Sequence, residues 1–133
     1  MEEIRTQIPG YEKGAVQYIA AANEEDALYL GAQMVTDLLN KWYANVAFFS
    51  LTLRGEALQA LVNDDKGFPC LYAVNQKNPD LGVVSRKAIG MISRKFVRAT
   101  IIEGFRGDVS RYQRDLEFLA SSTNTPVIVI VLN

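Results

Sequence analysis

The side chains that could do chemistry in this sequence are mostly carboxylates. Glu24–Asp26 are three acidic residues in a row, and Glu103 follows an apolar run. The 133 residues include no histidine, which removes the commonest general base and the commonest metal ligand together. Cys70 is the single cysteine, so a disulfide within one chain is excluded, and we predict a buried, reduced thiol. Serine–histidine, cysteine–histidine and histidine–metal chemistries are therefore excluded.

The carboxylates support two interpretations. Glu24–Asp26 suit the start of a helix, where the helix dipole stabilises negative charge, and they would equally serve as an interaction surface. A lone acid such as Glu103 is more often a solvated or capping residue than a metal ligand, because magnesium usually needs substrate phosphates to complete its shell. We therefore predict neither a metal site nor a cofactor.

Basic residues gather in the second half of the chain. They form either a charged helix face in solvent or a contact surface for a phosphate backbone or an acidic partner. The net charge of −1 argues mildly against nucleic acid as the main ligand, since nucleic-acid binders more often carry a basic excess. The candidate contact residues are Arg86, Lys87, Arg94, Lys95, Arg106, Arg111 and Arg114, with Arg98 nearby.

Elements of two kinds must position these side chains, and they alternate along the chain. Continuous apolar runs predict strands, and apolar residues at helical spacing predict helices. Asp80 is a plausible N-cap of the third helix. The predicted strands are 15–21, 46–51, 70–74, 97–102 and 126–132, and the predicted helices are 25–42, 54–63, 80–96 and 110–121.

This alternation predicts one three-layer, doubly wound α/β domain over residues 1–133, with a mostly parallel sheet of about five strands. Ligands of such sheets bind where the strands end and the chain turns into the helices. We therefore expect any site at residues 21–27, 50–55, 103–108 and 132–133.

Several of these segments, read in order, resemble the RecA-like, P-loop ATPase domain of the DnaB family of replicative helicases. The similarity covers nearly the whole chain, and it depends on the order and spacing of its pieces more than on any one of them. Those pieces are Gly10–Gly14 with the apolar strand that follows, Val46–Leu51, Cys70–Tyr72 with Asn78–Leu81 and the basic helix after it, and Arg114–Ala120 with Thr125–Ile130.

The resemblance implies a degenerate nucleotide site. At the Walker A loop, Asp26 occupies the glycine position, Ala27 the lysine position and Leu28 the Ser/Thr position. Thr52 occupies the position of the glutamate that polarises the attacking water, and threonine cannot take that proton. Glu103 corresponds to the Walker B aspartate, and Leu132 to the sensor glutamine. The family's C-terminal strands, which carry an arginine for the neighbouring subunit's site, have no counterpart here.

Loss of these groups predicts a catalytically inactive, DnaB-helicase-like domain without a cofactor. We expect it to act through a protein partner or through copies of itself, in DNA replication or in mobile-element maintenance. A nucleic-acid-binding accessory protein that uses the basic second half is one alternative, and a residual nucleotide-binding ATPase is another. A cytoplasmic protein is expected, because the sequence contains no signal-peptide stretch and no apolar run long enough to span a bilayer.

Overall fold

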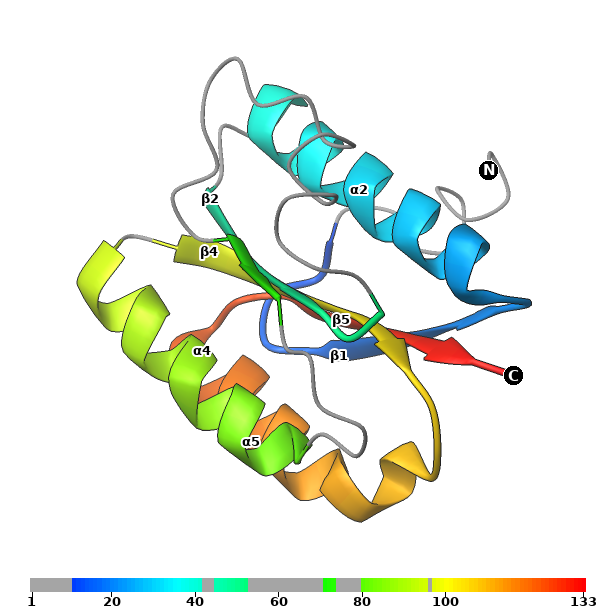
Figure 1. Cartoon of the computed structure of the whole chain (residues 1–133). Coiled ribbons are helices and arrows are strands. Elements are labelled where there is room, and N and C mark those ends of the chain that lie inside the picture. Colours follow the sequence, from blue (N-terminus) through cyan, green and yellow to red (C-terminus); the bar gives the residue numbers. More distant parts are fainter. Residues whose placement is uncertain (1–10, 42–44, 53–70, 74–79, 96) are drawn as a thin grey trace.

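In the described part of the chain, the central feature is a five-stranded, wholly parallel sheet with helices on both faces (Figure 1). The computed structural model describes residues 11–41, 45–52, 71–73, 80–95 and 97–133. The strand order is β1-β5-β4-β2-β3. Along the chain the elements are β1 (Val16–Ala21), α2 (Glu24–Lys41), β2 (Asn45–Ser50), β3 (Leu71–Ala73), α4 (Leu81–Lys95), β4 (Val97–Phe105), the 3-10 helix η1 (Val109–Tyr112), α5 (Gln113–Thr123) and β5 (Val127–Leu132). The predicted three-layer α/β fold is confirmed.

The helices divide into two layers. Helix α2 covers one face of the sheet, while α4 and α5 pack side by side on the other face (Figure 1). The core has two parts accordingly. Ile19, Val35 and Ile101 belong to the part beneath α2, whereas Leu116 and Val129 belong to the part beneath α4 and α5. Strands β4 and β5 are buried on both faces, which explains their continuous apolar runs.

Polar side chains cap two helices at their first turn. The side chain of Asn23 accepts a hydrogen bond of 2.8 Å from the backbone N–H of Asp26 at the start of α2. The Asp80 carboxylate accepts one of 2.8 Å from the N–H of Gly82 at the start of α4, which confirms the predicted cap. Each cap satisfies a backbone donor that the first turn of a helix leaves without an intrahelical partner.

Two predicted boundaries are wrong. Strand β4 continues past Ile102 to Phe105, because a bulge at Gly104 lets the strand keep pairing with β5. The last helix does not begin at Ser110: the Asp108 side chain caps the 3-10 helix η1 there, and α5 starts at Gln113. The other described elements begin and end within about two residues of their predicted bounds. The predicted helix 54–63 lies outside the described residues.

Among the described residues, no helix is both long enough and apolar enough to cross a membrane.

Candidate functional site: a buried carboxylate at the carboxyl edge of the sheet

The carboxyl ends of the strands meet along one edge, as the parallel topology requires. Ser50 of β2 lies opposite Glu103 of β4, and Ala21 of β1 lies opposite Leu132 of β5. The backbone N–H of Asn133 donates to the carbonyl of Ala21 over 3.1 Å. Segments that are far apart in the sequence are therefore brought together at the edge where we expected a site.

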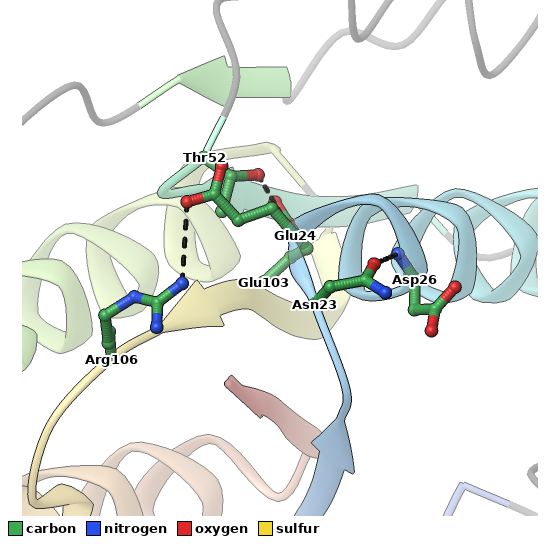
Figure 2. Close-up of polar contacts among 6 residues, drawn as sticks. All are labelled: Asn23, Glu24, Asp26, Thr52, Glu103 and Arg106. Atoms are coloured by element: carbon green, nitrogen blue, oxygen red, sulfur yellow. Dashed lines mark hydrogen bonds and ion pairs between the residues drawn. The ribbon is translucent and has the colours of Figure 1, made fainter. Parts of the chain in front are cut away.

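Glu103 is the central residue of this edge, and its side chain is 0% exposed. The Ser50 hydroxyl donates to Oε2 over 2.7 Å, and the Thr52 hydroxyl donates to Oε1 over 2.7 Å. The backbone N–H of Leu51 also donates to the Glu103 carbonyl, over 2.9 Å. Strand β2 and the residues after it thus hold both carboxylate oxygens (the Thr52 contact is drawn in Figure 2).

Helix α2 lies directly over this carboxylate at Gly31. A Cβ on Gly31 would lie 3.3 Å from Cγ of Glu103 and 2.8 Å from Cζ of Phe48. A glycine is needed here because any side chain would push the helix away from the sheet. The close approach of α2 explains why Glu103 is buried, and it corrects the interpretation of this residue as a solvated or capping acid.

The surroundings of Glu103 have opposing effects on its pKa. Burial raises the pKa, because the charged form loses its hydration. The hydrogen bonds from Ser50 and Thr52 lower it, and the negative charge of Glu24 raises it further. Burial is the largest effect, so the pKa of Glu103 is raised above its ordinary value.

A bulge at Gly104 orients the end of β4. Glu103 pairs with Ile130 and Phe105 pairs with the next residue, Val131, so Gly104 is left out of the register. Its φ of +89° lies in the region that favours glycine. In a regular strand Phe105 would share the face of Glu103. Because of the bulge, Phe105 instead packs into the core beneath α4 and α5, while Glu103 faces α2.

The connection from β1 to α2 consists of Ala22 and Asn23 alone. Asp26, in the first helical turn, is exposed, whereas Ala27 is 0% exposed and Leu28 belongs to the core beneath α2. The positions that the resemblance matches to the Walker A lysine and Ser/Thr therefore carry side chains that point into the protein.

The acidic turn contacts the end of β4 through one ion pair. Arg106 Nη2 lies 3.6 Å from Glu24 Oε2, and Figure 2 shows this ion pair. Both side chains are more than half exposed. Such exposed pairs contribute little to stability. The pair shows that the loop after β4 and the start of α2 are neighbours at this edge.

The predicted basic surface is spread over two edges of the sheet and one helix layer. Arg94 and Arg98 flank the junction of α4 and β4 at the amino edge, whereas Arg106 and Arg111 lie beyond the carboxyl end of β4. The other candidates are Arg86 and Lys87, exposed on α4, Arg114, exposed on α5, and Lys95, whose side chain lies outside the described residues.

Leu132, the residue matched to the sensor glutamine, is buried in the core beneath α2, and the exposed Asn133 follows it. Sequence reasoning placed Glu103 and Thr52 at the site but missed the roles of Ser50, Gly31 and Gly104. A serine directly after the buried run 46–49 was the only local signal for the first of these.

A scan against protein-family models finds no match, and a search of curated proteins finds no significant relative. Within the described ranges, no group of three or more cysteine, aspartate or glutamate residues could hold a metal ion. The resemblance to replicative helicases therefore stays a prediction.

Proposed function

We propose that this chain is a non-catalytic, RecA-like domain that acts through protein contacts, beside a replicative helicase or with copies of itself, in DNA replication or mobile-element maintenance. The observation that carries the proposal is the state of Glu103. The carboxylate that the resemblance matches to the Walker B aspartate accepts hydrogen bonds on both oxygens and lies beneath α2. A magnesium-binding acid needs an oxygen directed at the ion or at its water shell.

The strand order also supports the proposal. The resemblance implies that the last strand lies between the first strand and the strand that carries Glu103. In the structure β5 pairs with β1 on one side and with β4 on the other. The β1–α2 turn is short, and the acidic side chains of Glu24, Glu25 and Asp26 follow it, so a triphosphate there would meet several like charges. One such contact at about 4 Å costs roughly 4 kcal/mol at an effective dielectric of about 20.

The test is a titration of the protein with ATP and magnesium by calorimetry, with phosphate release measured in parallel. We expect neither heat of binding nor turnover above a buffer blank. Arg106→Ala serves as a matched control, because it removes one exposed cation at this edge and should change nothing. Saturable binding, or turnover that Glu103→Gln abolishes, would replace the proposal with the residual ATPase.

A nucleic-acid-binding accessory function is a second candidate, and the composition of α4 favours it. The helix LGVVSRKAIGMISRK contains four basic residues and no acidic one. We would measure the anisotropy of labelled single- and double-stranded DNA at several salt concentrations. Binding that weakens with salt, and that Arg86→Glu and Arg94→Glu reduce, would support this candidate. A flat signal would leave protein contacts as the better account.

A further inference from the structure

The outer edge of β1 offers unpaired backbone groups to a partner. In the described part of the chain β1 pairs with β5 alone and so forms one end of the sheet (Figure 1). The carbonyls of Ala15 and Ala21 accept hydrogen bonds from the N–H groups of Val127 and Asn133 on the β5 side. Because backbone direction alternates along a strand, the N–H and C=O groups of residues 16, 18 and 20 face outward.

Within the described residues, this edge lacks the usual protection against pairing. Natural edge strands are guarded by charges, proline, bulges or very short length. The strand VQYIAA has six residues, with no charge and no proline, and its register with β5 is regular throughout. Tyr18, at its middle, is 43% exposed, and Ala20 is exposed as well. The strand can therefore accept another strand along its whole length.

Helix α5 places one positive and one negative side chain beside this edge. Asp115 faces α4, because a Cβ on Gly82 would lie 3.1 Å from Asp115 Oδ2. Glu117 is on the opposite flank. The pKa of Tyr18 is raised, mainly by burial of its hydroxyl and further by the negative charge of Glu117. Arg114 precedes Glu117 by one helical turn and shares its flank by helical spacing. The side of α5 next to β1 is therefore self-complementary in charge.

We propose that β1 pairs antiparallel with β1 of a second copy of this chain across a two-fold axis at Tyr18, which joins the two sheets into one. The outward groups fix the register, since residues 16, 18 and 20 must lie opposite residues 20, 18 and 16 of the partner. This register forms about six backbone hydrogen bonds, two for each of three residue pairs. It also brings the two copies of α5 together on one face, with Arg114 of each near Glu117 of the other.

The inference rests on the proposed function only in taking the chain as a module that acts through protein contacts. We infer that the partner is a second copy because the contact is isologous, with the same surface on both sides. The uncharged strand pairs with its own copy, and the Arg–Glu flank of each α5 complements that of the other. A heterologous strand would meet the same backbone groups but would not bring a matching Arg–Glu pair to α5, where Glu117 accepts a hydrogen bond of 3.2 Å from Gln113 of its own helix. Mass measurement and nucleotide titration are independent, so each proposal can fail alone.

The mass is measured by light scattering after size-exclusion chromatography over a range of loading concentrations. We expect a rise from one chain to two and no further. Tyr18→Lys puts like charges directly opposite each other and should weaken the dimer about tenfold or more. Tyr29→Lys is the matched control, since Tyr29 is an exposed tyrosine on α2, away from this edge, and the dimer should persist. Thermal unfolding of both variants checks that each is folded.

Charge reversal tests the arrangement of the two helices. Glu117→Arg should weaken the dimer about tenfold, because the change affects both symmetry-related pairs. Adding Arg114→Glu restores the opposite signs and should bring the affinity back to within about threefold of the original. Glu25→Arg, at an exposed acid on α2, should leave the dimer unchanged.

A cross-link tests the register itself. In a chain that carries Cys70→Ser, Tyr18→Cys should form a disulfide between copies, because Cα atoms about 5.5 Å apart suit the bond. Tyr29→Cys in the same background should not form one. A monomer at every concentration, an assembly larger than two, or a dimer that withstands both Tyr18→Lys and Glu117→Arg would overturn the inference.

Discussion

The clearest consequence of the buried carboxylate is a stability that depends on pH, and Glu103→Gln should remove that dependence. Glutamine has the size and shape of a protonated glutamate. Its carbonyl oxygen can accept from one of the two hydroxyls, and its amide can donate to the other, since a hydroxyl both donates and accepts. The substitution therefore keeps the contacts of Ser50 and Thr52 with the side chain and removes only the charge.

The sign follows from the direction of the pKa shift. The pKa of Glu103 is raised in the folded protein, so the folded state holds the proton more tightly than the unfolded chain does. This stabilisation is complete below the unfolded pKa of about 4.3, and it is lost as pH rises through the folded pKa. Between the two values, the free energy of unfolding falls by up to about 1.4 kcal/mol per pH unit for this one group.

The assay is urea unfolding of both proteins at a series of pH values, from about the unfolded pKa of 4.3 upward. The other carboxyls titrate equally in the two proteins, so the difference between the curves isolates Glu103. The two stabilities should be similar at the acidic end, and the Glu103→Gln variant should become the more stable one as pH rises. Parallel profiles would refute the reasoning. So would a variant less stable at neutral pH by about 1.5–3 kcal/mol, the value of hydrogen bonds to a charged group, because the ionised form would then be the stabilised one.

Four further substitutions test the local geometry by the same unfolding assay. Gly104→Ala should cost about 2–4 kcal/mol, because alanine is strained at a φ of +89° and its Cβ would overlap the methyl of Thr52; an unchanged midpoint would show that the bulge is not rigid. Gly31→Ala should destabilise the protein by about 1 kcal/mol, because its Cβ would clash with the Phe48 ring. Gly90→Ala, with nothing within 4 Å of its Cβ, should stabilise the protein by about 0.5–1 kcal/mol. Equal effects of these two would contradict the close approach of α2. Ala27→Lys should cost about 3 kcal/mol or more, since it buries an unpaired charge; a stable variant that gains ATP binding would show that the Walker A position still faces solvent.

The sequence by itself was enough to predict the architecture, because that depends on patterns within single elements. The apolar run of β5 and the helical spacing of apolar residues in α2 each reflect burial of one segment, whatever lies against it. The cap at Asp80 is a contact across two residues and is equally local. Alternation of such elements leaves few folds besides a parallel sheet with helices on both faces.

The chemistry of the site was decided by tertiary structure. The sequence shows a glutamate after an apolar run, which suits a solvated end of a strand as well as a buried one. Its burial requires α2 to approach at Gly31, and its hydrogen bonds come from Ser50 and Thr52, which lie 53 and 51 residues earlier in the chain. The bulge at Gly104 then keeps β4 paired beyond Glu103. A residue's preference for burial is a local property, but the protonation and accessibility of a carboxylate depend on groups that only the folded chain brings within hydrogen-bonding distance.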